Sequence, residues 1–154
     1  TFGKAIMHPL SIEALGDLGE GLTTEVWWSP AHPFKSSLTG QSSQSLADAY
    51  EASSRKQWTQ PLGFAHALFE VASDALKRSK SLKPADVRNA VASSKLKTVV
   101  GDVAWDGQGP FKNVSKTPLV LGQWNKGKKF KYELTIVNNE AAPAIPLGGK
   151  LKPL

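Results

Sequence analysis

Apolar side chains recur at every third or fourth position after Pro61, and this is the strongest pattern in the sequence. The positions are Leu62, Ala65, Leu68, Phe69, Ala72, Ala75 and Leu76. Such spacing predicts a helix with one wide apolar stripe. Pro61 suits its first turn, where a missing N–H costs nothing, and Lys77 and Arg78 suit its last turn, where cations interact favourably with the helix dipole.

Weaker patterns predict the other elements. Further helices are expected over residues 12–15, over a segment that ends near Lys56, and after Pro84, where Val87, Ala90 and Val91 form a buried stripe. Strands are expected at residues 2–7, 23–28, 98–100, 119–123 and 130–137. Because helices and strands are mixed along the chain, the predicted fold class is α/β.

Two segments have the composition of turns. Residues 101–110 are rich in Gly and Asp, and residues 125–128 separate two predicted strands. The second segment predicts a hairpin turn with Gly127 at a positive φ.

Composition limits the class of protein. The 154 residues (16.6 kDa) are 40% apolar and 21% charged, which suits one compact domain with its own core. The absence of cysteine excludes disulfides, thiolate zinc sites and cysteine nucleophiles. No apolar stretch approaches the roughly 18 residues of a membrane span.

The net charge of +6 is concentrated in the last third of the chain. Residues 95–154 carry ten lysines and four acids, whereas residues 1–94 are balanced at nine of each. An excess of this kind indicates either an anionic partner such as nucleic acid or a lysine-rich solvated surface. The last third has no arginine and no aromatic cluster, and this favours the solvated surface.

A search for catalytic and metal-binding motifs yields few candidates. The three histidines are not at ligand spacing, and HExxH, GxGxxG and GxSxG patterns are absent. Asp102 and Asp106 flank Trp105, as a glycosidase pair would, but carboxylates that cap turn amides explain them better. We therefore expect no catalytic residue, no metal and no cofactor.

Aromatic residues at chain breaks are better candidates for ligand contacts. Trp28 stands at the end of a predicted strand, just before the proline-rich segment 29–33, and Trp58 precedes the start of the long helix. An aromatic side chain in such a place can line a pocket for a flat or apolar ligand. His8 and His32 follow predicted strands, where α/β proteins place ligand groups.

Four segments in a particular order resemble a known family. They are GFAHALFEVA (63–72), PADVRNAV (84–91), GDVAWDGQG (101–109) and LVLGQW (119–124). Together they resemble the C-terminal portion of a type I periplasmic substrate-binding protein, of the branched-chain amino-acid ABC transporter group. The resemblance implies two α/β lobes joined by three crossing segments, a solute enclosed between the lobes, a periplasmic location and a membrane permease as partner. It also implies that the family's N-terminal half lies outside this chain.

On this mapping the chain has three parts. Residues 1–33 finish the second lobe and form a crossing segment, residues 34–104 are the helical part of the first lobe, and residues 105–154 form the third crossing, a second-lobe hairpin and a tail. The apolar stripe of residues 62–76 is then expected to pack on first-lobe strands that this chain does not contain.

The resemblance suggests a binding protein without catalysis. Members of the family that bind amino acids place an acidic residue in the loop that here reads His8-Pro9-Leu10, and this chain has no acid there. The solute is expected to be a small carboxylate, with an aromatic acid preferred over a branched-chain amino acid. The candidate ligand-binding residues are His8, Trp28, Trp58 and Gln60. The alternative is a stand-alone module that binds anions or nucleic acid through the lysine-rich last third.

Overall fold

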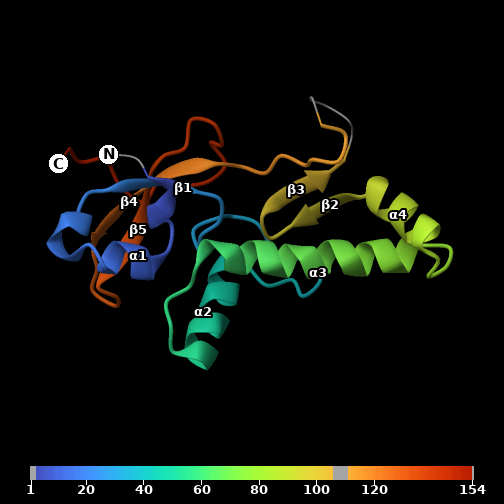
Figure 1. Ribbon diagram of the computed structural model, residues 1–154, viewed down its shortest axis with the longest axis horizontal. Coiled ribbons are helices and arrows are strands. Elements are labelled where there is room, and N and C mark those ends of the chain that lie inside the picture. The colour runs from blue at the N-terminus through green and yellow to red at the C-terminus, as the bar shows by residue number, and fades with distance from the viewer. Residues whose placement is uncertain (1–2, 106–110, 154) are drawn as a thin grey trace.

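The computed structural model describes residues 3–105 and 111–153 and shows a mixed α/β fold, as the sequence predicts (Figure 1). A three-stranded sheet with short helices lies at one end. The long helix begins beside this sheet and runs to the other end, where a two-stranded hairpin and a short helix lie (Figure 1).

In chain order the elements are the 3-10 helix η1 (Lys4–Ile6), α1 (Pro9–Glu13), the 3-10 helix η2 (Gly16–Gly19), β1 (Thr23–Val26), α2 (Ser43–Ser54), α3 (Gln60–Arg78), α4 (Pro84–Ala92), β2 (Lys95–Thr98), β3 (Gly101–Ala104), β4 (Val120–Lys126) and β5 (Tyr132–Asn138).

The three-stranded sheet has the order β1-β4-β5, and both pairs are antiparallel. Val120, Gly122 and Trp124 alternate along β4 and pair with Val26, Ile136 and Leu134, so one face of the sheet carries two apolar clusters that Leu134 joins. One cluster consists of Val26, Val120, Ile136 and Ile145, and the other of Ile12, Trp124 and Tyr132. A bulge between Leu121 and Gly122 shifts the register of β4 against β5.

A third cluster joins α2, α3 and the β2–β3 hairpin. Its buried residues are Trp28, Ala47, Ala67, Val99, Val100 and Val103. Trp28 comes from the segment that leaves β1, so this cluster links the three-stranded sheet to the helices. A Cβ placed on Gly63 of α3 would lie only 2.3 Å from Trp28 Cγ. The glycine therefore allows the helix backbone to lie directly against the indole.

Two buried polar side chains of α3 fix its position. The Gln60 side chain accepts a hydrogen bond from Trp27 N (2.8 Å) and donates one to the carbonyl of Glu25 (3.0 Å), so the start of α3 is attached to β1. Glu70 accepts hydrogen bonds from Ser37 N (2.6 Å) and Ser37 Oγ (2.9 Å), and from Val99 N (3.0 Å). A buried carboxylate is tolerated when donors surround it, and these donors come from two separate segments.

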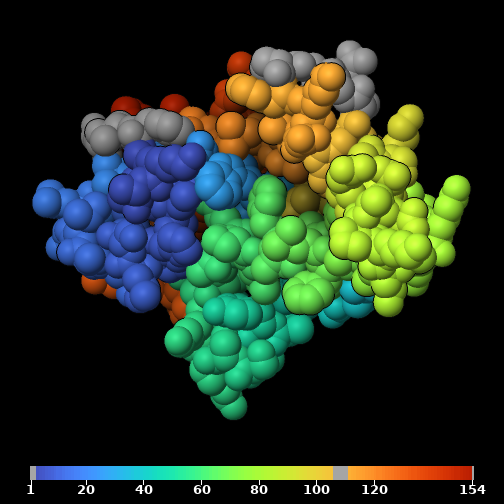
Figure 2. Space-filling model, turned by 45° about the vertical axis from the view of Figure 1, so that its right-hand side comes forward, coloured from blue at the N-terminus to red at the C-terminus, as the bar shows by residue number. Residues whose placement is uncertain are grey.

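The apolar stripe of α3 lies mostly in solvent. The helix buries its small and polar face, formed by Gly63, Ala67 and Glu70, whereas Leu68, Phe69 and Leu76 are 71%, 69% and 51% exposed. Figure 2 shows a stretch of α3 lying open at the surface between α2 and α4. The long helix is thus confirmed, and its apolar stripe has no cover within the part of the chain that the structure describes.

Four local predictions are wrong. Residues 101–104, expected to belong to a turn, form the strand β3. Residues 4–6 form η1 rather than a strand, and the preceding Gly3 is hydrogen-bonded to β1, with its N–H donating to Thr23 O and its carbonyl accepting from Thr24 Oγ1. Val99 and Val100 are buried but form the turn between β2 and β3; this turn is closed by Thr98 Oγ1, which accepts from Val100 N and donates to the carbonyl of Gly101.

The hairpin between β4 and β5 also differs from the prediction. The strand β4 continues to Lys126, and Gly127 N donates to the carbonyl of Lys131 across the turn. Gly127 does not have a positive φ. A glycine is needed here because a side chain would not fit: a Cβ at this position would lie 2.5 Å from both Phe130 O and Glu133 Cγ.

We expect Gly63→Ala to destabilise the fold strongly. The substitution normally stabilises a helix by about 1 kcal/mol, but here the new methyl group would overlap the Trp28 ring and cost about 3 kcal/mol. Urea unfolding followed by circular dichroism measures the difference. Gly3→Ala is the matched control, because its Cβ would meet nothing closer than 3.4 Å; equal unfolding free energies for the two variants would contradict the close packing.

Candidate functional site

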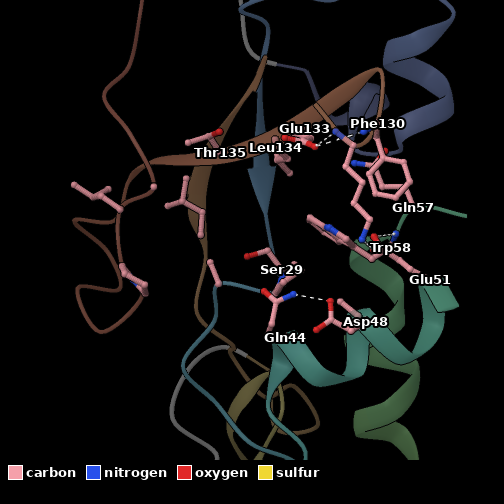
Figure 3. Close-up of a pocket in the computed structure, with 18 residues that line it drawn as sticks. Ser29, Gln44, Asp48, Glu51, Gln57, Trp58, Phe130, Glu133, Leu134 and Thr135 are labelled. Atoms are coloured by element: carbon pink, nitrogen blue, oxygen red, sulfur yellow. Dashed lines mark hydrogen bonds and ion pairs between the residues drawn. The ribbon is translucent and has the colours of Figure 1, made fainter. Parts of the chain in front are cut away.

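A pocket of about 510 Å³ lies between the three-stranded sheet and α2 (Figure 3). Its walls come from the turn after β1, from α2, from the connection before α3, from β5 and from the tail. The lining residues are Ser29, Pro30, Ala31, Gln44, Ala47, Asp48, Glu51, Gln57, Trp58, Lys129, Phe130, Glu133, Leu134, Thr135, Ile136, Pro146, Leu147 and Gly148. A volume in this range suits a small organic molecule.

Trp58 supplies the aromatic wall of this pocket. Its backbone N–H donates to Glu51 Oε1 (3.2 Å), which ties the connection to the end of α2. Its ring meets Trp28 edge to face, with the ring centroids 6.0 Å apart. Trp28 is completely buried behind it, so the orientation of Trp58 is set by a rigid neighbour.

The polar groups of the pocket are mainly acidic. Asp48 and Glu51 on α2 face Phe130 and Glu133 across the pocket (Figure 3). Lys129 Nζ forms an ion pair with Glu51 Oε2 (2.5 Å), and this hydrogen bond raises the pKa of Lys129. Three carboxylates and one ammonium group line the pocket, so the pocket is negative within a protein of positive net charge.

Hydrogen bonds preorganise these acids. Asp48 Oδ1 accepts from Gln44 Nε2 (2.8 Å), and Glu133 Oε1 accepts from the backbone N–H groups of Lys129 (3.0 Å) and Phe130 (3.4 Å). Gln57 donates to the carbonyl of Tyr132 (3.0 Å), while its Oε1 is buried with no hydrogen-bond partner among the described residues. The pocket wall therefore contains an unpaired acceptor.

A buried histidine shapes the turn that forms the floor of the pocket. Ser29 N donates to His32 Nδ1 (3.0 Å), and His32 N donates back to the carbonyl of Ser29 (3.1 Å). Burial disfavours the imidazolium and lowers the pKa of His32 to about 4. The neutral ring thus holds residues 29–31 in place as part of the pocket wall.

The structure brings together three of the four predicted ligand-binding residues. Trp58 lines the pocket, Trp28 lies directly behind it, and Gln60 is buried at the start of α3 with both polar ends of its amide bound to the β1 segment. His8 is exposed at the N-cap of α1 and does not line this pocket.

Sequence reasoning missed the acidic side of the pocket. Gln44, Asp48 and Glu51 are spaced by four and three positions, which puts them on one face of α2. This spacing was a usable signal. Glu133 offers no such signal, because it meets α2 only through tertiary packing.

The glycosidase pair suggested by the sequence lies only partly within the described residues. Asp102 lies on β3 opposite Lys97, and Asp106, its partner in the glycosidase hypothesis, lies outside the described residues. Among the described residues no group of three His, Asp or Glu side chains could hold a metal ion. None of the described helices combines the length and apolarity needed to cross a bilayer.

Comparison with solved structures identifies the fold of the chain. The chain has the α/β fold of part of a type I periplasmic substrate-binding protein, the fold of branched-chain amino-acid ABC transporter binding proteins, and it covers roughly a third of their length. The resemblance inferred from the sequence motifs is thereby confirmed at the level of the fold. The sequence matches no protein-family model and no curated protein.

Three solved structures illustrate the match. The leucine-binding protein LivK of Thermotoga maritima aligns with a TM-score of 0.65 and 16% identity, over 86% of this chain and 35% of LivK. A solute-binding protein of R. palustris in complex with benzoate aligns with a TM-score of 0.60 and 15% identity, over 97% of this chain and 39% of that one. LivJ of Streptococcus pneumoniae in complex with isoleucine gives 0.58 and 14%, over 82% and 34% of the two chains.

The buried His32 predicts an acid-sensitive fold. Its pKa of about 4 lies below the value of 6.5 expected in the unfolded chain, so the unfolded chain binds the proton more strongly. The stabilisation from the neutral ring is complete above pH 6.5 and is lost as the pH falls towards 4, by about 3 kcal/mol in all. Unfolding free energies between pH 7 and 4 measure it.

His32→Asn should flatten this pH dependence, because the amide oxygen can still accept from Ser29 N but does not titrate. His8→Asn is the matched control, since it removes an exposed histidine and leaves His32 unchanged. An equal pH slope in wild type and His32→Asn would show that other groups cause the acid sensitivity.

Proposed function

We propose that the chain is part of the solute-binding component of an ABC transporter and that the pocket beside Trp58 is its share of the solute site. The observation that carries the proposal is the pocket itself: an aromatic wall and several preorganised polar groups lie between two separate layers of the structure. The similarity in fold to binding proteins whose structures contain benzoate or isoleucine supports it. Binding then requires closure of the walls around the solute and no chemical step.

The lining of the pocket restricts how a carboxylate solute can bind. Trp58 suits the flat or apolar body of an aromatic acid or a branched-chain amino acid. Asp48, Glu51 and Glu133 repel a carboxylate group, so the anionic end must point away from α2 and β5. An ammonium group would be favoured beside the same acids, and a branched-chain amino acid thus becomes as suitable as an aromatic acid.

The four predicted site residues have different roles in this proposal. Trp58 makes the direct contact, and Trp28 and Gln60 position it through the core and through the start of α3. His8 stays a prediction without a contact to this pocket.

The exposed face of α3 supports a further part of the proposal. Leu68, Phe69 and Leu76 form a contiguous apolar strip with the exposed Ala65 and Ala72. Apolar surface of this kind marks an interaction site. The chain spans only about a third of the matched structures, so we propose that the rest of such a fold, supplied by the N-terminal half, covers this face. A periplasmic location and a membrane permease as partner complete the proposal.

Truncating Trp58 should weaken solute binding. In a protein that contains this chain together with the rest of the fold, Trp58→Ala should lower the affinity for benzoate or leucine by about tenfold, because about 1.4 kcal/mol of aromatic contact is lost. Trp58→Phe should retain most of the affinity. Isothermal titration calorimetry measures both.

The control for this experiment is Trp27→Ala. Trp27 packs edge to face on Phe64, with the ring centroids 6.1 Å apart, and does not line the pocket. It should leave the affinity nearly unchanged. If both alanine variants bind the solute as tightly as the wild type, Trp58 is not in the solute site.

Charged substitutions on the exposed face of α3 should affect stability differently in the 154-residue chain and in the complete fold. In the 154-residue chain alone, Leu68→Glu with Phe69→Glu should reduce self-association and dye binding and leave the thermal midpoint almost unchanged, since both side chains are exposed. In the complete fold the same pair should cost about 3 kcal/mol or more, because the charges would be buried.

Analytical ultracentrifugation and thermal unfolding give these readouts. Ala85→Glu, on an exposed position of α4, is the control and should have little effect in either context. The covered face would be disproved by a double variant that is as stable as wild type in the complete fold.

A further inference from the structure

A second pocket, of about 740 Å³, lies on the other side of the His32 turn, and nothing in the proposed solute site uses it. Two passages of the chain meet here: the segment that leaves β1 and the segment that enters β4. Phe34 and Pro118 belong to these passages, and both lie beside Gly101, where a Cβ would be 3.5 Å from Phe34 Cε2 and 2.9 Å from Pro118 Cδ. The tail at residues 141–145 forms another wall of the pocket.

The pocket is basic. Lys35, Lys97 and Lys116 line it from three different segments, and none of them forms an ion pair with a carboxylate in the described residues. The one acid in the lining is Asp102, which lies opposite Lys97 in the β2–β3 register. Three ammonium groups against one carboxylate leave two positive charges without a counterpart, and such a site favours a doubly charged anion.

Hydrogen bonds hold two parts of the pocket wall in shape. Asn139 Nδ2 donates to the carbonyl of Ile145 (2.6 Å), and Ala142 N donates to that of Asn139 (2.8 Å), so the tail is held in shape. The turn next to Lys97 is closed by Thr98 Oγ1. The lining also includes the Phe34 ring and the proline rings of Pro33, Pro118 and Pro143. Walls that are held in shape before binding keep the entropic cost of binding low.

From this arrangement we infer a second binding site for a small phosphate monoester that carries a flat, apolar body. The phosphate group carries about −1.5 to −2 charges at neutral pH and matches the two unpaired positive charges. The pocket is larger than a bare phosphate needs, and Phe34 and the prolines offer an apolar surface for the body. The inference stands apart from the proposed solute site, since the two pockets share no lining residue.

Phenyl phosphate is the probe that tests this site. Calorimetric titration of the 154-residue chain at low salt should show it binding more tightly than inorganic phosphate and than phenol. Lys97→Glu and Lys116→Glu should each weaken phenyl phosphate binding by about tenfold, because each reverses a charge beside the anion. Added salt should weaken it as well.

Lys95→Glu is the matched control. Lys95 is exposed on the same strand as Lys97, but it does not line the pocket. Its substitution by Glu changes the net charge by the same amount as Lys97→Glu. It should change phenyl phosphate affinity less than about twofold. Circular dichroism confirms that each variant is folded, and Lys116→Gln serves as the milder replacement if a charge reversal unfolds the chain.

Three results would overturn the site. The first is no measurable binding of phenyl phosphate. The second is an equal loss of affinity in Lys95→Glu and Lys97→Glu, which would indicate attraction by the overall positive charge, and the third is equal affinity for inorganic phosphate and phenyl phosphate, which would show that the apolar walls take no part.

Discussion

The contact between Trp28 and Gly63 determines how the two ends of the molecule are joined. Trp28 leaves the three-stranded sheet and fills the space between α2, α3 and the β2–β3 turn, and it does so because α3 presents a bare backbone at Gly63. Gln60 and Glu70, at the same side of α3, add hydrogen bonds to β1, to the loop before α2 and to the hairpin. Larger side chains on this face would push the helix away from the sheet, and the wall that carries Trp58 would move with it.

The turn after β1, residues 29–35, separates two pockets of opposite charge. Ser29, Pro30 and Ala31 belong to the acidic pocket, whereas Pro33, Phe34 and Lys35 belong to the basic one. His32 lies between these groups, buried and neutral, and it fixes the turn through Ser29. An uncharged residue is needed there, since an imidazolium without a buried counter-ion would be costly. One short segment thus sets the geometry of both sites.

The helix α3 has two faces of opposite composition, and its burial is the reverse of what an isolated domain would show. Its small and polar residues face the core, and Leu68, Phe69 and Leu76 face solvent. In the proposed complete fold, this helix would lie between two layers, and the second layer would cover its exposed side.

The sequence by itself determined the class of the fold, the long helix, the strands around residues 23–26, 120–123 and 132–137, and the resemblance to substrate-binding proteins. These features depend on local periodicity and on short motifs, which the chain carries wherever it folds. Tertiary structure alone decided that the strand predicted at residues 2–7 is a 3-10 helix, that Val99 and Val100 form a turn, and that Trp28 is core while Trp58 lines a pocket. It also decided the charge of each pocket, because it places Glu133 in the same lining as Asp48 and Glu51, and Lys97 in the same lining as Lys35 and Lys116. Contacts of this kind depend on how the elements pack against one another, and no local pattern of residues encodes them.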